Sequence, residues 1–450
     1  AGTCRRRFPP ILAAFAAAAL LAPFVGAATT VTYPSATTNC TNADTLQNCI
    51  DNATADGDTL EIATNSPIAE SPTVDHGLTI VPATGFTPEI DGFVFLEGAS
   101  TSTAFRVSGL AIHGEVRAAP GTGDLDVEIS DDVVTVNSSS ANAIEVSSGT
   151  SPPYGNVTAR ILRNTVSANG TGGFEACSGI IFGPIEDTGT SSALIQGNRV
   201  TTTNCGEGTA LLATNGPGET LTADILDNFV SAPGTGDGIE LRNFEQTSGS
   251  LLIGRIINNV ATGQKNIAGF PGGIVVSADG FEPIQAQVIN NTVAYNDSGI
   301  GVDARTDLGA SITGVVANNI VAHNPSYGLS IGTSVSGTVD DRFNLLFANG
   351  FNSPPGPGSL AQDPLFVSTS DFHLLDPSPA INHGDTALVP SDITKDLDGH
   401  ARIQGPAVDM GAYESGVTSV EAIPTLSTGA TAALALLIAL VAVASLRRPG

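Results

Sequence analysis

The sequence predicts an all-β fold, a parallel β-helix of about ten coils, from two repeating patterns. A short apolar strand that ends in Asn, one further residue and an apolar residue returns about every 30 residues, and a second strand, typically Gly-Ile, follows each copy. One such coil is too small to bury its own apolar face, so the coils must stack about 4.8 Å apart and pair their backbone edges. The repeated Asn stands at Asn164, Asn198, Asn228, Asn258, Asn291, Asn319 and Asn344, and Asp132 takes its place in an earlier copy.

The repeated Asn predicts a structural ladder inside the coils. An inward Asn at a turn can hydrogen-bond the backbone of its own turn and of the next coil, and Asn tolerates the left-handed conformation of sharp turns. A second Asn follows five residues later in four copies, at Asn169, Asn296, Asn324 and Asn349.

The Gly-Ile strand alternates between inward and outward residues. In the copy at Ile300 and Gly301, followed by Val302 and Asp303, the two aliphatic residues would point inward and the other two outward. Polar outward residues on successive coils would then share one exposed face.

The N-terminal part predicts a cap for the first coil. Residues 44–53 place Leu46, Cys49 and Ile50 at helical spacing, and residues 58–62 then read as the first strand. A short helix over the first coil would protect its exposed edge.

The cysteines fit an oxidising compartment. Outside the first residues the chain has four, Cys40, Cys49, Cys177 and Cys205, without a CxxC motif. The spacing favours a local Cys40–Cys49 disulfide, and a Cys177–Cys205 disulfide could join neighbouring coils, although the connectivity stays open.

Composition excludes several classes of protein. The chain has 450 residues, 17 Lys and Arg, 44 Asp and Glu, and a net charge of −27. This charge repels phosphate backbones and argues against a nucleic-acid partner. Long amphipathic helices are absent, which excludes a helical bundle, and a hydrophobic content of 41% argues against disorder.

Both ends predict export. Arg5, Arg6 and Arg7 precede an apolar run and small residues up to Ala27, the order of a secretory signal peptide, which we place at residues 1–27. Residues 423–446 are uncharged and long enough to cross a bilayer, and two Arg residues follow. The segment 423–450 resembles the IPTL-CTERM sorting signals of Gram-negative bacteria through its sequence Ile-Pro-Thr-Leu-Ser, which implies a membrane sortase as partner.

Two further resemblances assign the body. The repeats resemble those of pectin-lyase-like β-helices, which implies a right-handed solenoid, placed with its N-terminal cap at residues 28–349. Residues 350–414, with Asp363-Pro364-Leu365-Phe366 and the segment from Val408 to Glu414, resemble the choice-of-anchor Q module that follows β-helices. Residues 415–422 then form a linker.

Candidate chemistry lies on the outward side of the Gly-Ile strands. Glu240, Arg242, Asp303 and Arg305 fall on neighbouring coils, and Lys265 lies in a long loop nearby. A polysaccharide lyase needs a basic residue, and an inverting glycosidase needs two carboxyls about 6.5–9.5 Å apart, a separation expected for Glu240 and Asp303. No complete catalytic set of the pectin-lyase-like enzymes is present.

Metal sites are weakly indicated. Asp396 and Asp398 resemble part of a calcium loop, so calcium is possible, and no other cofactor is expected.

Two functions remain open from the sequence. The first is a monomeric surface protein of the Gram-negative cell envelope that binds polysaccharide or extracellular matrix without catalysis. The alternative is a carbohydrate-active enzyme, a polysaccharide lyase or a glycoside hydrolase, acting on the β-helix face.

Overall fold

The computed structural model describes residues 28–416, except 139, 149–152, 172–176, 186–188, 244–248, 266–271, 306–308 and 333–336. The predicted signal peptide and the sorting segment at 423–450 lie outside the described residues. Within the described part, no helix is long and apolar enough to span a bilayer.

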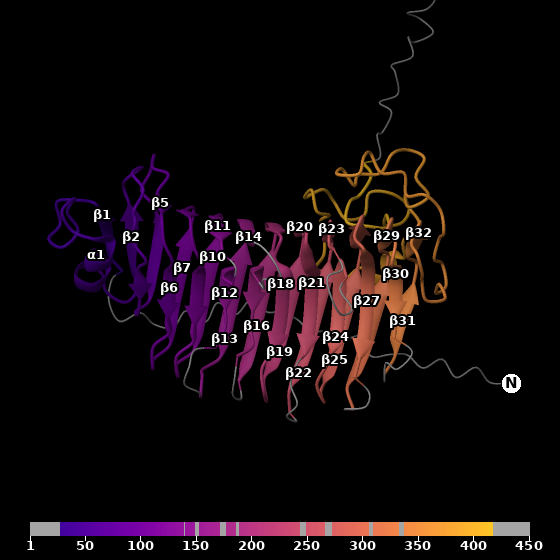
Figure 1. The fold of residues 1–450 in the computed structure, drawn as a ribbon, viewed down its shortest axis with the longest axis horizontal. Helices are drawn as coiled ribbons and strands as arrows, with labels where there is room; N and C mark the ends of the chain where they lie inside the picture. The colour runs from indigo at the N-terminus through magenta and orange to yellow at the C-terminus, as the bar shows by residue number, and fades with distance from the viewer. Residues whose placement is uncertain are drawn as a thin grey trace, which may run out of the picture.

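The chain winds into a right-handed parallel β-helix with three sheets, as the repeats predict (Figure 1). Sheet A has twelve strands, and sheets B and C have ten each. Neighbouring strands of a sheet come from successive coils and pair in parallel. Each coil therefore satisfies its backbone polar groups through the coils on either side.

Within each sheet the strands follow one another in the order of the coils. Sheet A contains β1 (Thr30–Tyr33), β2 (Asp58–Ile62), β4 (Leu78–Pro82), β7 (Thr103–Ser108), β10 (Leu125–Ser130), β13 (Val157–Leu162), β16 (Thr190–Gln196), β19 (Thr220–Leu226), β22 (Leu251–Ile257), β25 (Pro283–Ile289), β28 (Ser311–Ala317) and β31 (Val339–Arg342). Sheet B contains β5 (Glu89–Ile90), β8 (Ala111–Ile112), β11 (Val133–Asn137), β14 (Thr165–Asn169), β17 (Arg199–Thr203), β20 (Phe229–Ser231), β23 (Val260–Thr262), β26 (Thr292–Ala294), β29 (Ile320–Ala322) and β32 (Leu345–Phe347). Sheet C contains β3 (Thr73–Val74), β6 (Val94–Glu97), β9 (Val116–Ala119), β12 (Asn142–Val146), β15 (Ser178–Phe182), β18 (Gly206–Asn215), β21 (Thr235–Asn243), β24 (Ile274–Ala278), β27 (Ser298–Ala304) and β30 (Tyr327–Ile331).

The core is a set of aliphatic columns that run along the solenoid. In sheet C one inward column is buried throughout and unbroken over nine coils: Val94, Val116, Ile144, Ile180, Leu211, Ile239, Ile274, Ile300 and Leu329. The predicted alternation in β27 is confirmed, because Ile300 and Val302 are buried while Gly301 and Asp303 are partly exposed.

The glycine of the Gly-Ile strand occupies a tight corner between sheets B and C. A Cβ atom added to Gly299 would lie 2.6 Å from the Val321 side chain of sheet B. The motif therefore starts with Gly because the corner backbone packs directly against the opposite interior wall.

The first coil is capped by helix α1 (Leu46–Ala53). Thr45 accepts a hydrogen bond from the Asn48 N–H, and Leu46, Cys49 and Ile50 bury the apolar face, as the helical spacing predicts. The expectation that residues 58–62 form the first strand is wrong, because β1 precedes and pairs in parallel with β2.

Both disulfides are present. Cys40–Cys49 ties α1 to the segment before it, and Cys177–Cys205 joins two coils that are 28 residues apart in sequence.

A ladder of buried amides follows the turn between sheets A and B. The Asn228 side chain donates to the Ile195 carbonyl at 2.9 Å and to the Asn259 Oδ1 at 3.0 Å, while its own Oδ1 accepts from the Asn198 backbone. The same pattern links Asn164, Asn198, Asn228, Asn259, Asn291, Asn319 and Asn344. The Asp132 backbone N–H donates to Oδ1 of the first member, Asn164.

The assignment of Asn258 to the ladder is wrong, because Asn259 takes that place. Asn258 precedes the ladder, with a left-handed φ of 59°. The inward residue two positions after the ladder Asn is Ala261 here, aligned with Val230 and Val293. Val260, one position after the ladder Asn, faces outward against another layer, and being apolar it shifts the apparent motif by one residue.

The C-terminal residues fold back over sheet B (Figure 1). Leu360 pairs with the last coil next to Leu345. Phe372, Met410 and Tyr413 then pack on outward residues of β23, β26 and β29. The outward residues Val260, Thr292 and Ile320 of sheet B are buried in these coils.

The three left-handed Asn residues before the ladder hold this layer in place. The side chains of Asn258, Asn290 and Asn318 donate to the carbonyls of Lys395, Asp409 and Asp385. Arg402 is buried beside them, donates to Asn258 and forms an ion pair of 2.6 Å with Glu414.

We expect Asn259→Ala to destabilise the fold by about 3 kcal/mol or more, because it removes buried hydrogen bonds and leaves backbone partners unsatisfied. Asn169→Ala is the control, since the Asn169 side chain donates to the Asn137 side chain at an exposed position, and it should cost less than about 1 kcal/mol. Equal losses in urea unfolding would contradict the ladder as a main source of stability.

Asp132 predicts a pH dependence. Burial raises its pKa to about 7, and its Oδ2 atom has no hydrogen-bond partner. Because the folded pKa lies above the unfolded value of about 3.9, the stability from this group is complete below about pH 4 and is lost as the pH rises through about 7. Asp132→Asn should therefore gain roughly 2–4 kcal/mol more at pH 8 than at pH 5 relative to the native chain; an equal effect at both pH values in urea unfolding would rule this out.

Candidate functional site

The candidate residues gather on the outward surface of sheet C, over β21, β24 and β27. We call this surface the sheet C face and define it by Asp237, Glu240, Arg242, Ser277, Asp279, Asp303, Arg305 and Tyr327. Parallel pairing places Arg242, Ser277 and Asp303 in one column on three successive coils. The prediction that polar residues of neighbouring coils share one face is thus realised in the backbone register.

Arg242 links two carboxylates on this face. Its guanidinium lies 3.3 Å from Glu240 Oε1 and donates from Nε to Asp279 Oδ2 at 2.7 Å. Ser277 donates to the other oxygen of Asp279 at 2.9 Å. The guanidinium is therefore held in one orientation between two coils.

Glu240 is a buried member of the group. Only 4% of the residue is exposed, and its second oxygen accepts from the Thr209 hydroxyl at 3.0 Å. Burial raises the pKa of Glu240, while the charge of Arg242 opposes the rise. In this arrangement both carboxylate oxygens are already hydrogen-bonded within the protein.

Glu240 and Asp303 do not lie opposite one another. Glu240 pairs in register with Val275 and Gly301, whereas Asp303 belongs to the neighbouring outward column. The two carboxyls are separated by two coils along the solenoid and by two residues along the strand. Asp279 follows β24 on the coil between them, and its charge raises the pKa of both.

Asp237 adds a carboxyl that can carry a proton near neutral pH. Burial, followed by the charge of Glu240, raises the pKa of Asp237 to about 7. Its Oδ1 accepts from the Gly272 N–H at 2.9 Å. Burial likewise raises the pKa of Asp303, with the charge of Asp279 as a further cause.

The Tyr327 ring lies beside Gly301 on the same face. A Cβ atom added to Gly301 would come within 3.0 Å of the Tyr327 hydroxyl, so the glycine leaves room for the ring. Burial and the charges of Asp237 and Asp303 raise the pKa of Tyr327, which keeps its hydroxyl protonated.

The remaining basic candidates lie at the borders of the face. Arg305 follows β27, and its charge lowers the pKa of Asp303 against the effect of burial. Lys265 lies on the turn that precedes sheet C and pairs with Asp297 at 3.2 Å, with 56% of its side chain exposed. The structure thus brings Arg242 and Arg305 to the carboxyls and gives Lys265 a different partner.

A second carboxyl pair lies on sheet C three strands nearer the N-terminus. Glu145 accepts from Asn142 at 2.6 Å and from Ser147 and lies 3.7 Å from Arg117. Burial raises the pKa of its hydrogen-bonded neighbour Glu115 to about 7, and the charge of Glu145 adds to the rise.

The calcium candidates are engaged with protein groups. Asp396 accepts from the backbone N–H groups of Asp398 and His400 with one oxygen and from that of Glu414 with the other. Asp398 lies 2.6 Å from His373 Nε2. The structure gives these residues a role in closing a turn, and calcium there stays a prediction.

Sequence reasoning missed Asp237, Asp279 and Tyr327. Ser277 is an outward residue of β24, and Asp279 is the next outward position along the chain. Extending the alternation by two residues would have found it. Asp237 could not be found in this way, because the corner before Ile239 interrupts the alternation, and β18 and β21 are out of register there.

Comparison with known proteins places part of this chain. Residues 186–341, which include the sheet C face, match a family model described as "Protein of unknown function (DUF1565)". Among solved structures the chain is similar to pectate lyase Pel9A, with 14% identity, a TM-score of 0.44, and coverage of 87% of this chain and 98% of that one. None of the curated proteins matches.

Arg242→Met should cost roughly 2–4 kcal/mol, because it leaves Glu240 buried without its cation. The double variant Arg242→Met, Glu240→Gln should recover most of that loss. Lys265→Met removes an exposed pair and should cost less than about 1 kcal/mol. Chemical unfolding of the three variants checks this, and an uncorrected loss in the double variant would show that Arg242 acts through other contacts.

Proposed function

We propose that this protein binds a neutral polysaccharide along the sheet C face and holds it at the cell surface without turnover. The observation that carries the proposal is the rigid Glu240–Arg242–Asp279 array, flanked by Ser277, on a flat parallel sheet. Arg242, Ser277 and Asp303 place one polar side chain on each of three successive coils, and this spacing suits an extended chain of hydroxyl-bearing sugars.

Charge favours a neutral glycan over a polyuronate. The face combines the carboxyls of Asp237, Glu240, Asp279 and Asp303 with two guanidinium groups, and Arg242 is already paired with two of those carboxyls. A polyanionic chain would meet net repulsion, whereas sugar hydroxyls can donate to carboxylates. Tyr327 adds an aromatic surface on which a sugar ring can lie.

Binding is favoured over catalysis because Glu240 is buried and fully hydrogen-bonded and lies diagonal to Asp303. An inverting pair needs one carboxyl on each side of the scissile bond with room for water.

Export and surface attachment belong to the same proposal. Support comes from the order of charged, apolar and small residues at 1–27, from the IPTL-CTERM-like segment at 423–450 and from two disulfides. We place the protein in the cell envelope of a Gram-negative bacterium as a monomer, with a membrane sortase acting on the tail. The layer over sheet B corresponds to the choice-of-anchor Q-like segment at 350–414.

A carbohydrate-active enzyme is the second candidate, either a glycoside hydrolase or a polysaccharide lyase. The specific observation in its favour is Asp237, whose pKa of about 7 lets it donate a proton at neutral pH beside the carboxyl of Glu240. If the native chain releases reducing ends from neutral glycans and Asp237→Asn does not, the function is hydrolysis and not binding alone. Unsaturated products from uronate polymers would identify a lyase.

Binding is tested with the purified full chain on a panel of neutral and acidic polysaccharides. We expect saturable binding to neutral polymers, and Asp303→Asn should weaken it about tenfold, the effect of losing roughly one charged hydrogen bond. Asp75→Asn is the matched control, because Asp75 follows β3 at the other end of sheet C and its side chain is 77% exposed. Preference for polyuronates, or equal loss in both variants, would contradict the proposal.

A further inference from the structure

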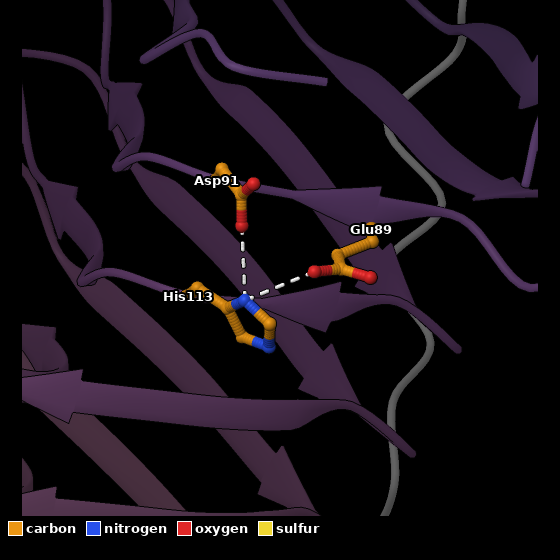
Figure 2. A group of neighbouring side chains, drawn as sticks. All are labelled: Glu89, Asp91 and His113. Carbon is orange, nitrogen blue, oxygen red and sulfur yellow. Dashed lines mark hydrogen bonds and ion pairs between the residues drawn. The ribbon is translucent and has the colours of Figure 1, made fainter. Parts of the chain in front are cut away.

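Three potential metal ligands converge near the N-terminal end of sheet B (Figure 2). Glu89 begins β5, Asp91 follows it directly, and His113 follows β8 on the next coil. His113 Nδ1 lies 3.1 Å from a Glu89 oxygen and 2.9 Å from an Asp91 oxygen. Across the described part of the chain, this is the one group of three such side chains with all donor atoms within 4.8 Å of each other.

The backbone register places the three residues at three of four neighbouring outward positions on two adjacent strands. Glu89 pairs with Ala111, and Asp91 stands beside His113 in the next outward column. Ala111 occupies the fourth position and contributes only a methyl group. One side of the group is therefore open, and 35–49% of each of the three side chains is exposed.

Hydrogen bonding alone cannot satisfy both carboxylates. Imidazole Nδ1 carries at most one hydrogen, yet two carboxylates aim at it (Figure 2). A metal ion between the three atoms would serve all of them. Two ligands about 2.1 Å from a metal lie about 3.4 Å apart in a tetrahedral site and about 3.0 Å apart at right angles, as in an octahedral site. The observed separations are 2.9 and 3.1 Å, so a small movement of the ligands or octahedral coordination accommodates the ion.

We propose that Glu89, Asp91 and His113 form a binding site for a divalent transition metal of the zinc class. One imidazole nitrogen with two carboxylates suits Zn²⁺, Co²⁺ or Mn²⁺ better than Ca²⁺, which takes oxygen ligands only. The ion joins two successive coils where the solenoid is not covered by the C-terminal layer. The open side at Ala111 leaves its remaining positions to water or to an exogenous oxygen ligand.

The test uses the full chain without a histidine tag, stripped of metal with a chelator and titrated with Co²⁺ and then Zn²⁺. We expect a visible Co²⁺ absorption that saturates at one equivalent and disappears when Zn²⁺ is added. His113→Gln should abolish this absorption, and Glu89→Gln should weaken Co²⁺ binding at least tenfold. Zn²⁺ should also raise the Tm of the native chain and leave that of His113→Gln unchanged.

His76→Gln is the matched control, because His76 also pairs through Nδ1 with a neighbouring carboxylate, that of Asp75, but has no second acid on the same nitrogen. It should bind Co²⁺ as the native chain does. Circular dichroism of each metal-free variant shows whether the fold is retained. Absence of saturable absorption, or equal binding in His113→Gln and His76→Gln, means an adventitious ion only and overturns the proposal.

Discussion

The structure depends on one constraint, that every coil must meet the next in register at the turn between sheets A and B. Two residues, such as Asp227 and Asn228, join the strands of sheets A and B there. The first adopts a left-handed conformation, and the backbone N–H of the second points into the interior. A buried N–H without a partner is costly. The Asn ladder supplies the missing acceptor from the next coil and returns a donor to the preceding one.

Once the interior is fixed in this way, the outward columns are free to vary, and they do so by sheet. In sheet B the outward residues Val260, Thr292 and Ile320 are buried where the C-terminal layer covers them. The left-handed residue of the turn gains a second task there, because Asn258, Asn290 and Asn318 turn their amides toward that layer. In sheet C the outward columns mix polar residues such as Glu240 with apolar ones such as Leu212 and Val275.

The repeat made the fold predictable, since its period, its Gly-Ile strand and its inward alternation all reflect the interior. Less could be predicted where the pattern has two readings. Either Asn258 or Asn259 could be the inward ladder residue, and the sequence pattern does not distinguish them. The choice is set by the C-terminal layer, more than 130 residues away, to which the Asn258 side chain is hydrogen-bonded. Asp237 could not be predicted as a residue of the face because a corner breaks the alternation. The position of His113 next to Asp91 could not be predicted because the first coils repeat every 22 residues and lack the Asn motif.

The outward carboxyls explain how so acidic a chain remains foldable. Parallel stacking in register would place like charges about 4.8 Å apart if one acidic residue were simply repeated. Instead Arg106, Glu128 and Arg160 alternate along sheet A, with ion pairs between successive coils. On the sheet C face Arg242 separates Glu240 from Asp279 in the same manner. Glu89 and Asp91 have only an imidazole between them, which leaves that pair of carboxylates the least compensated of these three sets and the one that a cation would complete.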